Sequence, residues 1–304
     1  MSLPNKCFLC KNKKNSQTLI TNKVYGDAEN KRSFFRCENC EIIYQFPKFT
    51  NKDQKKMYAS EFENYMDKRV GKKIWQNPNL NSQHNIETKN RRLKYLKKYI
   101  NKKYKNILEL GAASGFMLEY FKKKKYNCYA VEPSILNLNY LSQNNIRAYN
   151  SLQNLKKNNK KIKFDLITHY FVLEHVVNPY NFLFNQIQLL KKGGKIIFEI
   201  PCYNDALYKI YNLNKFENFY WSKVHNFYFN KNSLNALLKK FNLKYHLFYD
   251  QRYDLSNHLY WCINGKPGGT KYFTEKLGVK IEKLYKQNLI NQGFADTLIG
   301  IIIK

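Results

Sequence analysis

The chain has 304 residues, a formal net charge of +31 and 43% hydrophobic residues. This length and composition allow a sizeable buried core in one large domain, or in one domain with a small additional module. No stretch is apolar for long enough to span a bilayer, and Met1–Lys6 lacks the apolar core of a signal peptide, so we expect a soluble, cytoplasmic protein.

The positive charge is distributed along the chain, with lysine-rich segments at 11–14, 122–125 and 156–163. Such an excess attracts nucleic acid or other anions. The chain is also rich in Asn, Tyr, Phe and Ile, as proteins of AT-rich genomes are, and this composition favours a compositional origin for the charge. The alternative is that the charge serves to bind anionic substrates such as nucleotide-linked sugars.

Four of the seven cysteines form two C-x2-C pairs, Cys7/Cys10 and Cys37/Cys40, with 26 residues between them. Four thiolates in two such knuckles are typical of a closed, tetrahedral, structural zinc site, although this intervening loop is longer than usual. Disulfides are rare in cytosolic chains, and a lone C-x-x-C beside a βαβ unit, the redox pattern, is absent. We therefore predict a zinc-ribbon-like module over residues 1–50.

Residues 51–104 are mostly polar and helical in pattern, and Arg91–Ile100 predicts an amphipathic helix. We interpret this segment as a helical connector or substrate cap.

From residue 105 onward, short apolar runs alternate with helix-length segments, which indicates a doubly wound α/β fold with a mostly parallel sheet. The expected strands are Asn106–Leu110, Tyr126–Val131, Phe164–His169 and Lys195–Ile200, and the expected helices are Phe116–Lys124, Leu136–Asn144 and Tyr180–Leu190. A helix over Ser233–Phe241 and strands over Tyr245–Tyr249 and Thr297–Ile303 complete a domain over 105–304, with an insertion at 251–295. Aromatic and polar residues at 252–261 suit either a sugar ring or a packed lid.

A glycine-rich turn follows the first of these strands and opens a helix, which places a ligand site at the carboxyl ends of the strands. A dinucleotide fingerprint would need its third glycine at Phe116. Small residues at Gly111, Ala113 and Gly115 instead fit S-adenosylmethionine, which has no pyrophosphate. Its ammonium group favours a nearby acid, and Glu109 is placed to supply one.

Glu132 ends the second strand, 21 residues after Gly111. A carboxylate at about this offset accepts hydrogen bonds from both ribose hydroxyls, and the alternative is a chance acid at a strand end. The segment Asn150-Ser151-Leu152 is expected beside the adenine, and Tyr170, after the next strand, is a further candidate cofactor-binding residue.

Four motifs in this chain resemble class I S-adenosylmethionine-dependent methyltransferases: ILELGAASG at 107–115, VEPS at 131–134, LEHV at 173–176 and KKGGKIIFEIP at 191–201. The resemblance implies a Rossmann-like sheet of order 3-2-1-4-5-7-6 with strand 7 antiparallel. Ala113 departs from the family, which most often has Gly there, but Ala is small and usually tolerated.

The segment FRCENCEIIY at 35–44 resembles the zinc-binding domain of sugar methyltransferases, including those that methylate carbon 3 of nucleotide-linked deoxysugars. The similar stretch of those C-methyltransferases carries a catalytic Tyr, Glu and His. This chain keeps the His, as His225, but has Ser222 and Val224 at the other two positions, and its segment after residue 250 differs from theirs, so we expect it to be without their extra C-terminal domain. O-methylation of a nucleotide-linked or surface-glycan sugar is therefore the favoured function.

Methyl transfer to a hydroxyl needs the acceptor placed behind the methyl carbon and a general base to remove its proton. Histidine suits this task near neutral pH, and His225 and His175 are the candidates. His175 could instead cap the following helix. A nucleic-acid methyltransferase that uses the basic surface, and a non-enzymatic zinc-module binding protein, are the alternatives; the retained Glu109 and Glu132 disfavour the latter.

Overall fold

The computed structural model describes residues 4–304, so the start of the Met1–Lys6 segment lies outside the described residues. The chain divides into two compact units, and each is described by itself. Unit 1 comprises residues up to Thr50, Leu173–Tyr180 and Glu199–Gly300; unit 2 comprises Asn51–Val172, Asn181–Phe198 and Ile301–Lys304. Within residues 4–304, no helix combines the length and the apolar character needed to cross a membrane.

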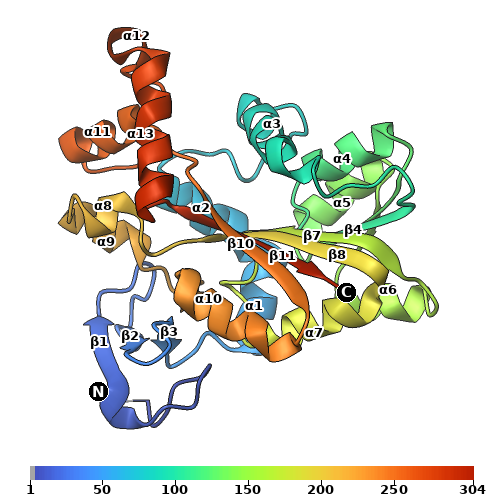
Figure 1. Ribbon diagram of the computed structural model, residues 1–304, viewed down its shortest axis with the longest axis horizontal. Helices are drawn as coiled ribbons and strands as arrows, with labels where there is room; N and C mark the ends of the chain where they lie inside the picture. Colours follow the sequence, from blue (N-terminus) through green and yellow to red (C-terminus); the bar gives the residue numbers. More distant parts are fainter. Residues whose placement is uncertain (1–3) are drawn as a thin grey trace. The chain divides into compact units, whose positions relative to one another are not determined.

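A mostly parallel seven-stranded sheet has the order β10-β11-β8-β7-β4-β5-β6 (Figure 1). Its strands are β4 (Asn106–Leu110), β5 (Asn127–Val131), β6 (Arg147–Tyr149), β7 (Phe164–Tyr170), β8 (Leu190–Pro201), β10 (Lys244–Asp250) and β11 (Thr297–Ile303). Numbered in chain order from β4, with β9 belonging to another sheet, this is 3-2-1-4-5-7-6 read from β6. The predicted fold class and strand order are thus confirmed.

The strands of unit 2 pair in parallel, and Leu110 of β4 lies opposite Val131 of β5. Beyond that pair, the Gly111 amide donates to the Val131 carbonyl (2.7 Å) and the Glu132 amide to the Tyr149 carbonyl (2.9 Å). The carboxyl ends of β4, β5 and β6 therefore meet at one edge, where ligands bind in sheets of this kind.

The sheet strands of unit 2 are buried along almost their whole length, which requires helices on both faces. The helices of this unit are α1 (Asn51–Lys56), η2 (Met57–Glu61), α2 (Phe62–Val70), α3 (Gln83–Leu96), α4 (Phe116–Lys123), α5 (Ile135–Gln143), α6 (Leu152–Asn158) and α7 (Pro179–Leu189). Helix α3 begins eight residues before the expected start, because Ser82 caps it by accepting from the Asn85 amide. Strand β8 is also longer than expected: Gly193 and Gly194, which precede the predicted strand, are paired with Lys304.

Unit 1 contains a second sheet, of order β1-β2-β3-β9. Its strands are β1 (Gln17–Thr21), β2 (Ser33–Cys37), β3 (Ile43–Phe46) and β9 (Phe227–Tyr228), and neighbouring strands run antiparallel. Phe34, Trp221 and Tyr228 pack ring against ring in its core. The N-terminal segment therefore shares both a sheet and a core with residues near 220, although the predicted division at residues 50 and 104 remains a prediction.

The remaining helices of unit 1 are α8 (Ala206–Lys209), α9 (Asn214–Tyr220), α10 (Lys231–Leu238), η3 (Lys239–Phe241), α11 (Leu255–Asn264), α12 (Thr274–Leu277) and α13 (Val279–Gln292). A short η1 (Lys14–Ser16) precedes β1. The expected insertion at 251–295 contains α11 to α13. Buried Glu282 ties α13 to α11, because its carboxylate accepts from the Ser256 hydroxyl and the Leu255 amide.

Candidate active site and cysteine cluster

The turn between β4 and α4 has three residues in the left-handed region: Gly111 (φ 67°), Ala113 (φ 46°) and Gly115 (φ 76°). A Cβ on Gly111 would lie 2.6 Å from Cγ2 of Val172, so side chains larger than hydrogen do not fit there. Ala113 tolerates a conformation that costs an L-residue roughly 1–2 kcal/mol. The turn is therefore sharp, and its backbone amides face the carboxyl end of β5.

Glu132 is held by this turn. Its Oε2 accepts from the Ala113 amide (2.8 Å) and its Oε1 from the Ser134 amide (2.9 Å). Burial raises the pKa of this carboxyl to about 7, and the two amides oppose the shift. Each carboxylate oxygen can accept more than one hydrogen bond, so both can still receive hydroxyl groups. This is the geometry expected of a residue that binds a ribose.

Glu109 lies on β4 and is only 3% exposed. Its Oε2 has no hydrogen-bond partner among residues 4–304, and burial raises its pKa to about 8. A buried, unsatisfied carboxylate oxygen is costly unless a ligand completes it. An ammonium group would do so, which is the fit expected for the amino end of S-adenosylmethionine.

Two further buried residues accompany this edge, and the sequence reasoning missed both. Arg92 of α3 lies over the Tyr170 ring at 3.7 Å, and its charge lowers the pKa of Glu109 against the effect of burial. Glu63 of α2 accepts from the Ser134 hydroxyl (2.5 Å) and the Asn137 side chain (3.2 Å).

A signal existed for the arginine. Arg92 and Leu93 precede Leu96 on the buried face of an amphipathic helix, where an arginine is unusual. No pattern distinguishes Glu63, because acids are common in a polar helical segment.

The expected adenine-side residues follow β6. Asn150 is exposed, Ser151 caps α6 by accepting from the Asn154 amide, and Leu152 is the first residue of that helix. Their position next to Tyr149, whose carbonyl accepts from the Glu132 amide, brings them to the same edge as the glycine-rich turn.

The two candidate bases meet in unit 1, although fifty residues separate them in the chain. The rings of His175 and His225 lie 4.6 Å apart between centroids, at 80°. Nδ1 of His175 lies 3.0 Å from the Val224 carbonyl, which can only accept, so Nδ1 carries the hydrogen of this bond. That hydrogen bond ties the His175 ring to the backbone next to His225.

Glu174 completes this cluster. Its Oε1 lies 3.7 Å from Nε2 of His175, and burial raises the pKa of Glu174 to about 8. Asn226 fixes the loop by donating its backbone amide to the Glu174 carbonyl (2.8 Å) and its side chain to the His175 carbonyl (2.9 Å). The cluster can take up protons, and its ligand atoms lie within 4.8 Å of one another, so it could also hold a metal ion.

The aromatic residues at 252–261 make contacts inside unit 1. Arg252 pairs with buried Asp296 at 3.1 Å, His258 lies 2.6 Å from the Tyr285 hydroxyl, and Trp261 is 4% exposed with its ring against Phe216. These contacts favour the packed-lid interpretation over a sugar-binding surface.

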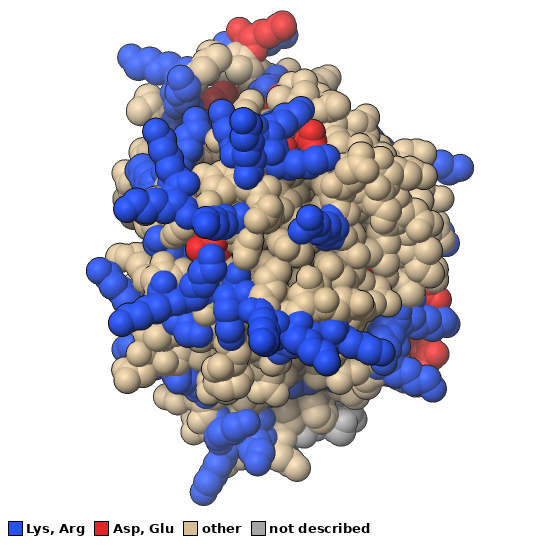
Figure 2. Space-filling model, turned by 90° about the vertical axis from the view of Figure 1, so that its right-hand side faces the viewer, with Lys and Arg blue, Asp and Glu red and all other residues tan. Residues whose placement is uncertain are grey.

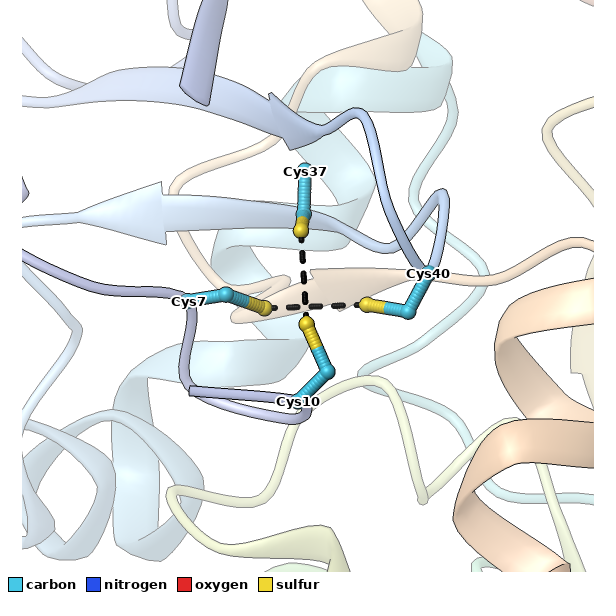
Figure 3. A group of neighbouring side chains, drawn as sticks. All are labelled: Cys7, Cys10, Cys37 and Cys40. Carbon is cyan, nitrogen blue, oxygen red and sulfur yellow. Dashed lines mark hydrogen bonds between the residues drawn. The ribbon is translucent and has the colours of Figure 1, made fainter. Parts of the chain in front are cut away.

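The four predicted zinc ligands come together (Figure 3). The Cys7 and Cys40 sulfurs are 3.6 Å apart, those of Cys10 and Cys37 are 3.5 Å apart, and all four lie within 4.8 Å of one another. A tetrahedral ion with Zn–S bonds of about 2.3 Å separates its sulfurs by about 3.8 Å. The spacing of the cluster therefore fits such an ion.

The two knuckles repeat one local structure. In the first, the Lys11 amide donates to the Cys7 carbonyl (3.1 Å); in the second, the Glu41 amide donates to the Cys37 carbonyl (2.8 Å). Lys11 and Glu41 both have φ above 60°. The Leu9 amide also donates to the Cys7 sulfur at 3.3 Å, as thiolate ligands require. A hydrogen bond from Cys40 lowers the pKa of Cys7.

A parallel sheet with a glycine-rich turn at its edge, an acid on the strand before that turn and an acid after the neighbouring strand defines the class I methyltransferase architecture. Residues 82–247, more than half of the chain, match the family model described as "Methyltransferase domain". The chain belongs to this family, and the prediction of an S-adenosylmethionine-dependent methyltransferase is confirmed at the level of the domain.

Curated relatives include the ubiquinone biosynthesis O-methyltransferase of Coxiella burnetii, for example of strain RSA 493, which is 30% identical over 112 residues. This match covers 35% of the chain and 48% of the relative, so the chain spans about half the length of the curated relatives it matches.

Among solved structures, a SAM-dependent methyltransferase from Archaeoglobus fulgidus is similar with a TM-score of 0.50 and 15% identity, over 80% of this chain and 100% of that one. The plantazolicin methyltransferase BpumL in complex with SAH has a TM-score of 0.48 and 16% identity, over 84% of this chain and 91% of that one. The first likeness supports the fold.

Proposed function

We propose that this protein transfers the methyl group of S-adenosylmethionine to an oxygen atom of a sugar, either nucleotide-linked or part of a surface glycan. The main support for this cofactor is the position of Glu132. Its two carboxylate oxygens are fixed by the Ala113 and Ser134 amides at the end of β5. A carboxylate in that place accepts both ribose hydroxyls. Bound there, the sulfonium cofactor supplies an activated methyl group.

The residues of unit 2 divide the binding task. Gly111 and Gly115 allow the backbone to approach the ligand closely, Glu109 faces its ammonium group, and Asn150, Ser151, Leu152 and Tyr170 line the adenine side. Arg92 has the supporting role of keeping Glu109 ionised when the ligand binds, since its charge counters the effect of burial.

His225 and His175 are the proposed bases. A histidine takes the acceptor hydroxyl proton as the oxygen attacks, and the adjacent Glu174 stabilises the resulting imidazolium charge. Their place in the chain supports this assignment, because Glu174 follows the end of β7 by only four residues.

Zinc is the proposed occupant of the cysteine cluster, in a structural role. All four coordination positions are filled by Cys7, Cys10, Cys37 and Cys40, so none remains for substrate. The metal would tie the turn between β2 and β3, which carries Cys40, to the segment that carries Cys7 and Cys10.

The acceptor class rests on resemblance. The segment at 35–44 is similar to the zinc-binding domain of sugar methyltransferases, and the loss of their Tyr and Glu beside His225 disfavours carbon as the acceptor. The curated relative named an O-methyltransferase supports oxygen.

The test is a mass gain of one methyl group in a panel of nucleotide sugars incubated with the protein and S-adenosylmethionine. Methylation of at least one panel member, with demethylated cofactor formed in equal amount, supports the proposal. Cofactor binding without methylation of any sugar in the panel would remove the sugar from the proposal and leave the cofactor site intact.

RNA is the second candidate acceptor, and the charge of +31 is the observation that favours it. Figure 2 shows Lys and Arg side chains over much of one face, with few acids among them. The measurement is the salt dependence of RNA binding: affinity that persists at physiological salt supports RNA, whereas affinity confined to low salt indicates nonspecific attraction.

A further inference from the structure

Unit 1 contains a polar pocket, separate in the chain from the glycine-rich turn, with a volume of about 160 Å³. Its lining includes three cations and one carboxylate: Arg36 of β2, Lys209 of α8, Lys231 of α10, and Glu41. Tyr203, which is 2% exposed, also lines the pocket. A hollow with this excess of positive charge is suited to an anion.

The cations are held in position by neighbouring rings and acids. Nζ of Lys209 lies 5.6 Å from the Tyr203 ring centroid and 4.7 Å from that of Tyr208, and Nζ of Lys231 lies 5.4 Å from the Tyr249 ring. Arg36 also pairs with the half-exposed Glu38 at 2.8 Å. The two lysines therefore keep their charge available to a ligand, while that of Arg36 is partly compensated.

Burial, and then the charge of Arg36, lower the pKa of Lys209. Cations that disfavour one another's charge are relieved by an anion between them. The lowered pKa thus agrees with the geometry of the pocket, which stands without it.

The first turn of α10 adds neutral donors at the same place, because Asn230, Lys231 and Asn232 all line the pocket. The Asn230 side chain caps the helix by accepting from the Ser233 amide, and its own NH2 group donates to the Glu41 carboxylate at 2.5 Å. This cap leaves the amides of Lys231 and Asn232, the first two of the helix, for an outside acceptor. Glu41 remains a carboxylate beside this cap, and the three cations of the lining outnumber it.

We propose that this pocket binds the phosphate or diphosphate group of a phosphorylated small molecule. Phosphate matches the mixture of lysine point charges, an arginine fork and helix amides that line it. The inference rests on the proposed function only in one respect: if the protein methylates a sugar, the pocket requires that the acceptor be phosphorylated.

The test is calorimetric titration with inorganic pyrophosphate at about 0.15 M salt, where the attraction between distant exposed charges is screened beyond about 8 Å. We expect saturable binding at one site, weakened about tenfold by Lys209→Gln and by Lys231→Gln. The matched control is Lys283→Gln, which removes the same charge from an exposed position on α13 and should leave the affinity unchanged. Equal weakening in all three variants, or no saturable binding to the wild type, would overturn the proposal.

Two further titrants identify the source of the phosphate. Tighter binding of a nucleoside diphosphate than of pyrophosphate supports a nucleotide-linked ligand, and tighter binding of a hexose 1-phosphate supports a simple sugar phosphate. Because these titrations need no cofactor, a protein that binds pyrophosphate but methylates no sugar would disprove the proposed function and leave the phosphate pocket standing. The reverse result, methylation with unchanged activity in Lys209→Gln and Lys231→Gln and no pyrophosphate binding, would disprove the pocket alone.

Discussion

The cofactor edge of unit 2 and the histidine cluster of unit 1 are built in different ways. Glu109, the glycine-rich turn and Glu132 come from two adjacent βα units, within about 25 residues of chain, and parallel pairing of β4 with β5 brings them together. His175 and His225 come from segments fifty residues apart, joined through Asn226 and the Val224 carbonyl. A site made by neighbouring strands can be inferred from spacing, whereas a site made by distant loops depends on packing.

The cysteine cluster combines both kinds of construction, because each C-x2-C pair is local whereas the two pairs are distant in the chain. Removing one of its ligands should have the largest effect. Cys40→Ala leaves three thiolates in a site that needs four, so we expect zinc affinity to fall at least 100-fold and the N-terminal sheet to lose cooperative unfolding, because metal binding and folding are coupled. The checks are metal content by mass spectrometry and thermal unfolding. Cys262→Ser, at an exposed cysteine outside the cluster, is the control. A Cys40→Ala protein with full zinc content would contradict the four-thiolate site.

The local construction of the cofactor edge leads to a second prediction. Glu132→Ala removes the acceptor of both ribose hydroxyls, each worth about 1.5–3 kcal/mol when hydrogen-bonded to a charged group, so S-adenosylmethionine affinity should fall at least 100-fold. Calorimetry measures it, with Glu119→Ala on α4 as an acid-removing control. Wild-type affinity in Glu132→Ala would refute the ribose assignment.

The histidine cluster should respond in the opposite way. His225→Ala should reduce turnover about 100-fold, the contribution of a general base, while cofactor affinity stays the same. Single-turnover methylation and calorimetry on the same sample separate the two quantities. Unchanged turnover would exclude His225 from the mechanism, and a parallel loss of affinity would make its role structural.

The resemblance to class I methyltransferases implied the strand order, whereas the alternation of apolar runs and the chain spacing predicted the glycine-rich turn after β4 and the place of Glu132 after β5. Sequence reasoning could not predict Glu63, whose contact with Ser134 depends on how α2 packs. Arg92, in contrast, left a signal in the sequence, because it stands on the apolar face of α3, where an arginine is unusual. The resemblance identified His225 as a candidate base, but only the structure shows that its ring contacts that of His175.

The smallest expected effect is a pH dependence that distinguishes the two acids of the cofactor edge. Burial raises the pKa of Glu109 to about 8, so below that pH the free protein holds this carboxyl protonated, and an ammonium ligand must displace the proton. Cofactor affinity should therefore rise as the pH increases from 6 to 8, by up to about tenfold per unit if one proton is released. Calorimetry in two buffers of different ionisation enthalpy gives the number of protons released.

Glu109→Gln should flatten the part of this pH profile that comes from Glu109. The pH dependence that remains belongs to Glu132, whose pKa is raised to about 7. Its contribution should therefore level off at a lower pH than that of Glu109. A profile in Glu109→Gln identical to that of the wild type would mean that the ammonium group does not face Glu109. Of the two acids, Glu132 alone would then contact the cofactor, and the unsatisfied Oε2 of Glu109 would need another partner.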